Sequence, residues 1–233
     1  ERIRAVIEET GYRPSVQART VRTKRACLIG VIVPKINSES ISRITEGIGQ
    51  ILAKSGYQML LTITNNNSSK ELEYVDLFEA YPVDGIILVG TVLTRAHKKK
   101  LKECKVPIVV IGQYTKETSC VYHDDYGAAK ALAEQVGREA SGRVAYIGVT
   151  REDKAAGAAR EDGFREGLKE VGKELEESCL RRAKFTMESG YEQAVDLLEK
   201  EHDIDIISCA TDTIAAGAIE AIAQYSPERK IQV

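Results

Sequence analysis

The chain has 233 residues, of which 43% are hydrophobic and 29% charged, and its formal net charge is −2. These values are typical of a globular protein that is large enough to bury a substantial core and to form two subdomains. Because no apolar run approaches the roughly 18 residues of a membrane span, and the start lacks the pattern of a signal peptide, we expect no membrane partner.

The charge is unevenly distributed along the chain. Residues 1–25 hold seven Lys or Arg and three Glu, a net charge of +4, whereas residues 26–233 hold 26 basic and 32 acidic residues, a net charge of −6. A basic end on an acidic body indicates either nucleic-acid contact at that end or a solvated tail. Charge alone leaves both alternatives open.

The first 25 residues read as two short helices separated by a break. Ile3, Val6 and Ile7 have helical spacing within Glu1–Glu9, and the Tyr12-Arg13-Pro14 stretch prevents that helix from continuing. Ser15 is a suitable cap for a second helix over 16–22, which is too short to be stable alone in water. A chain that begins within a charged helix leads us to expect a lost N-terminal domain.

From Cys27 onward, apolar runs alternate with amphipathic stretches. The pattern predicts strands over 28–34, 57–64, 85–89, 107–111, 120–123, 143–149, 180–185 and 204–209, and helices over 38–55, 69–80, 94–103, 125–138, 153–171, 187–200 and 212–225. Such alternation predicts parallel sheets covered by helices, an α/β fold. A polar break at 139–142 favours two Rossmann-like subdomains, at 26–140 and 141–233, preceded by the segment 1–25. The last four residues read as the start of a strand, so we expect truncation at both ends.

The five cysteines do not have the spacing of a metal or disulfide site. They are scattered and form no CxxC pair, and most lie in or beside strand-like runs: Cys27, Cys104, Cys120, Cys179 and Cys209. This distribution predicts buried, reduced thiols and a cytoplasmic protein.

Ligands of open parallel sheets bind at the carboxyl ends of the strands, which selects the polar residues after each apolar run. Asp124-Asp125 and Asp212 each open a helix there, so they are either helix caps or acceptors for the hydroxyls of a polyol. Arg160 follows the small residues 157–159, which would let a ligand approach, although most helical arginines are solvated. Lys35, after the first strand, is either a surface charge or an anchor for an anion.

Signatures of enzymes are missing from the sequence. It has no GxGxxG after a strand, no GxxxxGK[ST] and no GxSxG. His97, His123 and His202 have no metal-binding spacing, and the adjacent Asp124 and Asp125 cannot flank a scissile bond from opposite sides. We therefore expect no enzyme, no cofactor and no metal.

The order of these features resembles the lactose/galactose-repressor family of bacterial transcription regulators. The residues that carry the resemblance are Gly11–Pro14, Leu28–Pro34, Val83–Leu88, Val106–Val109, Asp124–Gly127, Arg143–Gly148, Arg160–Phe164 and Cys209–Asp212. Within the family, the chain looks most like the subgroup of trehalose-operon repressors, through Tyr122–Gly127, Gly148–Thr150, Gly157–Arg160 and Cys209–Thr213. The resemblance implies a periplasmic-binding-protein-like core preceded by the hinge and the remnant of a helix-turn-helix domain.

The resemblance also implies roles for single residues in binding an effector. Arg160 matches an arginine that grips sugar hydroxyls, and Asp125 and Asp212 match the polar residues that face it. Phe185 falls where some members place an aromatic ring against the sugar, and Lys35 where the trehalose repressor grips phosphate with an arginine. A lysine would bind phosphate as a point charge, without bidentate geometry. The favoured effector is trehalose 6-phosphate, ahead of an unphosphorylated sugar or a purine-like co-repressor.

For DNA, the resemblance implies that two protomers pair their hinge helices in the minor groove of the operator. Val21 takes the place of the apolar wedge, Ser15 and Ala18 match neighbouring minor-groove positions, and Arg19 and Arg22 match phosphate contacts. The family's first two headpiece helices and its C-terminal segment are absent here.

We therefore expect a homodimeric repressor of carbohydrate-utilisation genes that is controlled by a sugar or sugar phosphate. The alternative is a solute-binding protein for sugar uptake, which shares the core but would normally carry a secretion signal and no basic hinge.

Overall fold

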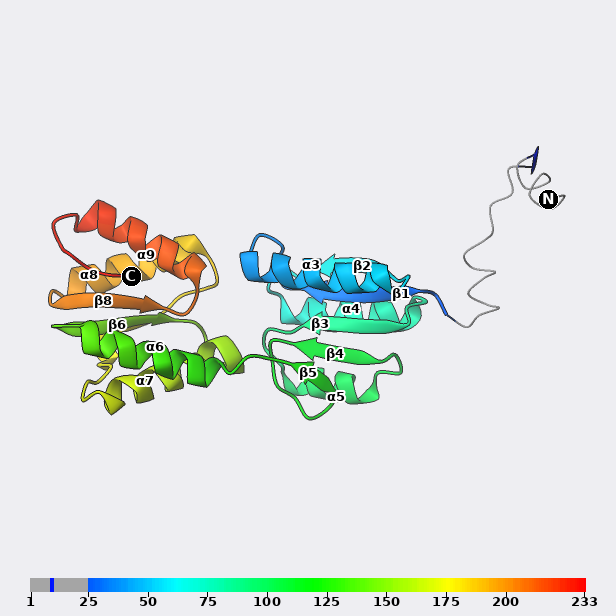
Figure 1. Ribbon diagram of the computed structural model, residues 1–233, viewed down its shortest axis with the longest axis horizontal. Helices are drawn as coiled ribbons and strands as arrows, with labels where there is room; N and C mark the ends of the chain where they lie inside the picture. The colour runs from blue at the N-terminus through cyan, green and yellow to red at the C-terminus, as the bar shows by residue number, and fades with distance from the viewer. Residues whose placement is uncertain (1–8, 11–24) are drawn as a thin grey trace. The chain divides into compact units, whose positions relative to one another are not determined.

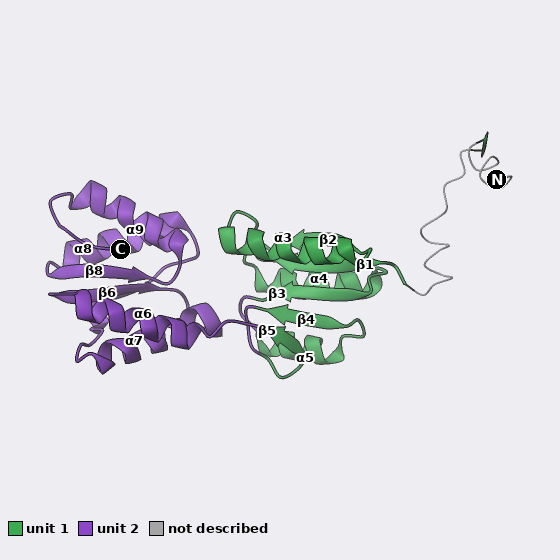
Figure 2. Ribbon diagram, viewed as in Figure 1, with its two compact units in different colours: residues 1–90, 94–111, 115–120 green, residues 91–93, 112–114, 121–233 purple. Residues whose placement is uncertain are grey.

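The computed structural model describes residues 9–10 and 25–233, and it consists of two compact α/β units (Figure 2). Unit 1 takes in the described residues up to Gly90, with Thr94–Ile111 and Thr115–Cys120. Unit 2 takes in Thr91–Leu93, Gly112–Tyr114 and Val121–Val233. The predicted DNA contacts lie outside the described residues: Ser15, Ala18, Arg19, Val21 and Arg22. No helix in the described ranges is both long enough and apolar enough to cross a membrane.

Unit 1 is built on a five-stranded sheet with the order β2-β1-β3-β4-β5 (Figure 1). Its strands are β1 (Leu28–Val33), β2 (Gln58–Ile63), β3 (Gly85–Val89), β4 (Ile108–Ile111) and β5 (Ser119–Val121). Its helices are α3 (Glu39–Lys54), α4 (Ser68–Ala80) and α5 (Arg95–Glu103). The pairs β1–β2, β1–β3 and β3–β4 are parallel, as the alternation of strands and helices predicts.

Both faces of β1 are buried, which explains its unbroken apolar sequence. On one face, Val31 and Val33 belong to a cluster against which α3 packs its isoleucines, Ile41, Ile44 and Ile48. On the other face, Phe78 of α4 covers Gly30, where an added Cβ would lie 2.4 Å from the phenylalanine ring. A side chain at position 30 would therefore force α4 away from the sheet.

Unit 1 also buries one of the three histidines whose spacing in the sequence does not fit a metal site. His97 of α5 is 1% exposed, and its Nε2 lies 3.2 Å from Oε2 of the equally buried Glu71 of α4. Its Nδ1 lies 2.8 Å from Oγ1 of Thr94, the residue that caps α5. These contacts give His97 a structural role in joining α4 to α5.

Unit 2 has a three-stranded parallel sheet with the order β7-β6-β8. The strands are β6 (Arg143–Gly148), β7 (Leu180–Arg182) and β8 (Ile204–Cys209), and the helices are α6 (Asp125–Glu139), α7 (Arg160–Glu170), α8 (Met187–Lys200) and α9 (Asp212–Tyr225). Figure 1 shows α6 with α7 on one side of the sheet and α8 with α9 on the other. The fully buried core between these layers is aliphatic apart from Tyr146, Phe164 and Cys179.

Close helix pairs in unit 2 depend on glycines. A Cβ at Gly163 of α7 would lie 2.2 Å from the carbonyl oxygen of Tyr126 in α6, and one at Gly167 would lie 2.2 Å from that of Lys130. A Cβ at Gly217 of α9 would lie equally close to the Met187 carbonyl of α8. Since the backbones touch at these positions, any larger residue would separate the helices that frame the sheet.

The α/β fold predicted from the sequence is confirmed, with three differences in detail. The helix predicted over 153–171 begins instead as a π-helix, Lys154–Ala159, before α7. Helix α6 packs against α7 and belongs to unit 2, so the division of the chain falls earlier than the boundary predicted at 140/141. The predicted final strand contributes a single parallel bridge between Gln232 and Ile206.

The cysteines agree only in part with the prediction of buried thiols. None of the five forms a disulfide, but Cys179 alone is fully buried, and the other four are half-buried. Cys27 directly precedes β1, Cys209 ends β8, and Cys120 lies in the edge strand β5. Burial nevertheless raises the pKa of the Cys209 thiol to about 12, which keeps it protonated at neutral pH.

Candidate functional site

At the carboxyl edge of the unit 2 sheet, the first residues of helices α6 and α7 form an ion pair. Nε of Arg160, at the start of α7, donates to Oδ1 of Asp125, at the start of α6, over 2.7 Å. Nη1 of Arg160 donates to the carbonyl oxygen of Ala210, just after β8, over 2.6 Å. Arg160 thus ties the starts of two helices to the end of a strand.

The pair is only partly closed to solvent. The Asp125 side chain is 8% exposed, whereas 34% of the Arg160 side chain is exposed. Arginine has five N–H donors, of which two are used by Asp125 and Ala210. The other N–H donors of this partly exposed side chain suit a ligand with hydroxyl or carbonyl oxygens.

The two adjacent aspartates have different roles. Oδ1 of Asp124 accepts from the backbone N–H of Gly127 over 2.8 Å, so Asp124 caps α6. Asp125 is buried and paired with Arg160, whereas Asp124 is exposed to solvent. Capping therefore accounts for Asp124, and the ion pair with Arg160 is the distinguishing contact of Asp125.

A buried hydrogen-bonded cap, which the sequence analysis missed, fixes the π-helix that leads into Arg160. Oδ1 of Asp153 accepts from the backbone N–H groups of Ala155 and Ala156, at 3.0 and 2.9 Å. The same oxygen accepts from Nε2 of Gln113 over 2.8 Å, and both side chains are 4% exposed. Burial raises the pKa of the Asp153 carboxyl, against the lowering effect of these hydrogen bonds. An aspartate before a run of small helical residues is the signal that could have identified this cap.

Glycine allows the π-helix to lie directly on the preceding loop. A Cβ at Gly157 would come within 1.9 Å of the carbonyl oxygen of Thr150. The small residues before Arg160, which the sequence analysis read as access for a ligand, thus also serve close packing of the backbone. Single π turns inside helices are frequent at functional sites, because they change the direction of the residues that follow.

The other predicted effector residues lie after the carboxyl ends of strands. Asp212 is the exposed first residue of α9, and the neighbouring Thr211 caps that helix through Oγ1. Phe185 follows β7 and packs, half-buried, against the core of unit 2. Lys35 follows β1 in unit 1, and partial burial lowers its pKa. Of the predicted effector residues, Asp125 and Arg160 are the pair that the structure shows in direct contact.

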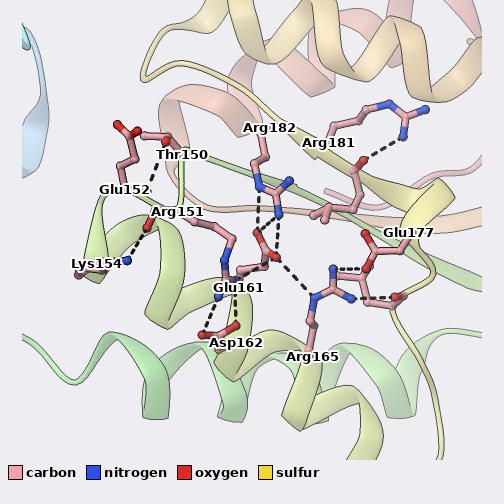
Figure 3. A network of polar contacts seen from close by, with 12 residues as sticks. Thr150, Arg151, Glu152, Lys154, Glu161, Asp162, Arg165, Glu177, Arg181 and Arg182 are labelled. Carbon is pink, nitrogen blue, oxygen red and sulfur yellow. Dashed lines mark hydrogen bonds and ion pairs between the residues drawn. The ribbon is translucent and has the colours of Figure 1, made fainter. Parts of the chain in front are cut away.

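Three arginines converge on Glu161, the residue that follows Arg160 (Figure 3). The Glu161 carboxylate is 3% exposed and lies 2.9 Å from Nη2 of Arg182, 3.1 Å from Nη1 of Arg151 and 3.5 Å from Nε of Arg165. Arg151 also makes two hydrogen bonds to Asp162, and Arg165 makes one to Glu177. This network fastens the first turn of α7 to β7 and to the loop before the π-helix, and so stabilises the orientation of Arg160.

Metal-dependent chemistry has no candidate site in the described ranges, 9–10 and 25–233. There, no three or more His, Cys, Asp or Glu side chains are grouped so that they could hold a metal ion. The carboxyl edge of unit 2 offers instead an ion-paired, partly exposed guanidinium and a buried carboxylate. Such a set of groups suits the recognition of a polyhydroxylated ligand by hydrogen bonds.

Comparisons with known proteins identify the family of this fold. Residues 26–226 match the family model of periplasmic binding proteins and the sugar binding domain of the LacI family. The sucrose operon repressor of Staphylococcus xylosus is 29% identical over 230 residues, which are 99% of this chain and 70% of that protein. Catabolite control protein A of Priestia megaterium is 28% identical over 221 residues, or 94% and 67% of the two proteins. The chain thus spans about two thirds of the length of these relatives.

Solved structures show the same fold. The transcription regulator CcpA of Lactococcus lactis superimposes with a TM-score of 0.75 and 27% identity, over 84% of this chain and 72% of that one. The trehalose repressor of Escherichia coli has a TM-score of 0.72, with 20% identity over 84% and 74% of the two chains, a level that shows the fold alone.

The named relatives are repressors and regulators of transcription, which are not enzymes. The two α/β units and the match over residues 26–226 lead to one assignment. The chain belongs to the LacI family of transcription regulators, and residues 26–226 match its periplasmic-binding-protein-like sugar-binding domain.

Proposed function

We propose that this chain is the effector-binding core and hinge of a homodimeric, cytoplasmic repressor that controls carbohydrate-utilisation genes. The observation that carries the proposal is the Arg160–Asp125 pair at the carboxyl edge of the unit 2 sheet. It presents N–H donors and carboxylate oxygens side by side, the combination that recognises vicinal hydroxyls of a sugar. Asp212 and Phe185, at the ends of neighbouring strands, supply a further acceptor and an aromatic face.

The effector is proposed to be a sugar or sugar phosphate, with trehalose 6-phosphate as the first compound to test. Support comes from the resemblance in the residues before and after Arg160 and from Lys35, whose partial burial would strengthen its attraction to a phosphate. One relative is named for sucrose, and one solved neighbour is a complex with cellobiose. Sucrose and cellobiose are therefore the competing ligands.

Calorimetric titration of the purified protein with trehalose 6-phosphate, trehalose, sucrose and cellobiose tests the proposal. We expect one of the phosphorylated or plain disaccharides to bind, and trehalose 6-phosphate to bind more tightly than trehalose. Equal affinity for these two would contradict the phosphate role of Lys35. Failure of all four sugars to bind would argue against the proposed class of effector.

The DNA-binding part of the proposal rests on the sequence of the hinge. Val21 would wedge into a minor-groove step, with Ser15 and Ala18 beside it and Arg19 and Arg22 on phosphates. Because such phosphate contacts release counterions, operator affinity should fall steeply with salt. Effector binding at the carboxyl edge would then change how readily two hinge segments pair on the operator.

A solute-binding protein for sugar uptake is the second candidate, because the same family model covers both classes. The basic stretch Gly11–Arg25, with five Lys or Arg and no acid, favours the repressor. A protein that binds a sugar but has no affinity for DNA at low salt would favour the transport role.

A further inference from the structure

Tyr146, in the centre of β6, buries a polar group that the fold does not use. The side chain is 2% exposed, and its ring stacks on Phe164 of α7 with centroids 4.7 Å apart. Within the described part of the chain, its hydroxyl is fully buried and has no hydrogen-bond partner. Packing against Phe164 requires only the ring, and a phenylalanine would provide it without burying an unpaired hydroxyl.

The hydroxyl end of this ring lies toward the carboxyl edge of the sheet. An added Cβ at Gly148, the last residue of β6, would lie 2.9 Å from Cε1 of Tyr146 and 3.8 Å from Cζ. The ring therefore covers Gly148 and leans along the strand in the direction of the helix starts. Glycine at position 148 leaves the space into which the hydroxyl end extends.

The Arg160 contact lies at the same level of the sheet. The backbone N–H of Ala210 donates to the carbonyl of Ile147, the residue between Tyr146 and Gly148, and the Ala210 carbonyl accepts from Arg160. Burial raises the pKa of the Tyr146 hydroxyl, and the positive charge of Arg160 opposes this effect. Tyr146 is therefore a neutral phenol within electrostatic range of the guanidinium, and it can donate or accept a hydrogen bond.

Two hydrogen-bond partners could satisfy a buried hydroxyl in this position, a water molecule or a ligand hydroxyl. If a permanently bound water pairs with the hydroxyl, removing the hydroxyl would destabilise the protein even without ligand. A ligand hydroxyl would leave it unpaired until binding, and its loss would affect binding alone. The position beside Arg160, whose side chain is one third exposed and can shift, favours the ligand.

We propose that Tyr146 is a specificity residue of the effector site, whose hydroxyl hydrogen-bonds a sugar hydroxyl that enters when Arg160 exchanges a protein contact for the sugar. This inference rests on the proposed function of the site. In this proposal, Tyr146 distinguishes between sugars that differ by one hydroxyl. Sites that hydrogen-bond a substrate hydroxyl reject analogues without it because the polar partner is then left unpaired.

The test is Tyr146→Phe, measured by calorimetric titration with trehalose 6-phosphate, trehalose, sucrose and cellobiose and by thermal melting without sugar. We expect affinity for the sugar that binds wild type to fall about fivefold to tenfold, the effect of one hydrogen bond. The melting temperature without sugar should stay the same or rise, because no protein contact is lost. Tyr191→Phe is the matched control: its hydroxyl donates to Gln224 over 2.8 Å, so this variant should keep sugar affinity.

An affinity of Tyr146→Phe within twofold of wild type would overturn the inference, and so would a lower melting temperature without sugar. Monodeoxy analogues of the bound sugar give a second measurement. One of them should bind wild type more weakly but bind Tyr146→Phe as well as the parent sugar does; the absence of such an analogue also counts against Tyr146. A wild-type protein that binds none of the four sugars contradicts the proposed function, and the inference falls with it.

Discussion

Replacing Glu161 by glutamine should destabilise unit 2 far more than the same change at its neighbour. Glu161 is 3% exposed and is the shared partner of Arg151, Arg165 and Arg182. Arg151 and Arg165 retain other carboxylate partners, whereas Arg182 pairs with no other acid in the described ranges. The substitution keeps the size of the side chain and turns an amide toward three cations.

The magnitude follows from the burial of the partners. Removing one member of a buried ion pair costs about 3–5 kcal/mol when the remaining charge stays buried. Here the arginine side chains are 31–43% exposed, so water can solvate them in part and the cost falls to about 2 kcal/mol. For a chain of this length, that corresponds to a decrease in melting temperature of about 4–8 °C.

Asp162→Asn provides the control, because Asp162 is adjacent in α7 but 49% exposed and pairs with Arg151 alone. We expect it to cost less than about 0.5 kcal/mol. Urea unfolding of both variants, followed by far-ultraviolet circular dichroism, measures the two free energies of unfolding. Equal effects, or a Glu161→Gln effect below about 0.5 kcal/mol, would refute the claim that Glu161 anchors α7.

Three further predictions concern the approach to Arg160 and the hinge. Gly157→Ala should lower the melting temperature and weaken sugar binding together, since its Cβ would overlap the Thr150 carbonyl; unchanged sugar affinity would contradict the role of the π-helix. Asp153 has a pKa raised above its ordinary value of 3.8, so its ionisation costs stability as pH rises through the folded pKa. Asp153→Asn should therefore gain stability relative to wild type as the pH rises above the ordinary pKa of 3.8, measured by urea unfolding at a series of pH values. A loss of stability relative to wild type as the pH rises would contradict this direction. Val21→Gly should weaken operator binding of the full-length regulator, and an unchanged gel-shift affinity would exclude Val21 as the wedge.

The fold was predictable because the signals for it are local. Apolar runs such as 28–34 and 143–149 predict strands buried on both faces, and isoleucines at helical spacing in 41–51 predict a helix with one apolar face. The point at which the chain divides into two units was harder to predict, because α6 follows unit 1 in sequence but packs against α7 of unit 2. Only tertiary contacts, among them the glycines of α7, show where that helix belongs.

The site was predictable in part. The rule for parallel sheets selected Asp125, and the small residues before Arg160 together with the family resemblance selected that arginine. The structure places the two side chains 2.7 Å apart. The Glu161 cluster was not predictable, because Arg151, Arg165 and Arg182 come from separate parts of the chain and charged helical residues usually face solvent. The π-helix was missed because its register depends on the packing of Gly157 against the backbone of Thr150.

The most direct test of the central claim is the response of the full-length regulator with Arg160→Ala. Operator DNA release by trehalose 6-phosphate, trehalose, sucrose and cellobiose is measured beside operator affinity without sugar, with the exposed Arg138→Ala of α6 as the control. We expect Arg160→Ala to bind the operator as wild type does and no longer to respond to the sugar, whereas Arg138→Ala should respond normally. A full sugar response in Arg160→Ala would contradict the assignment of the effector site.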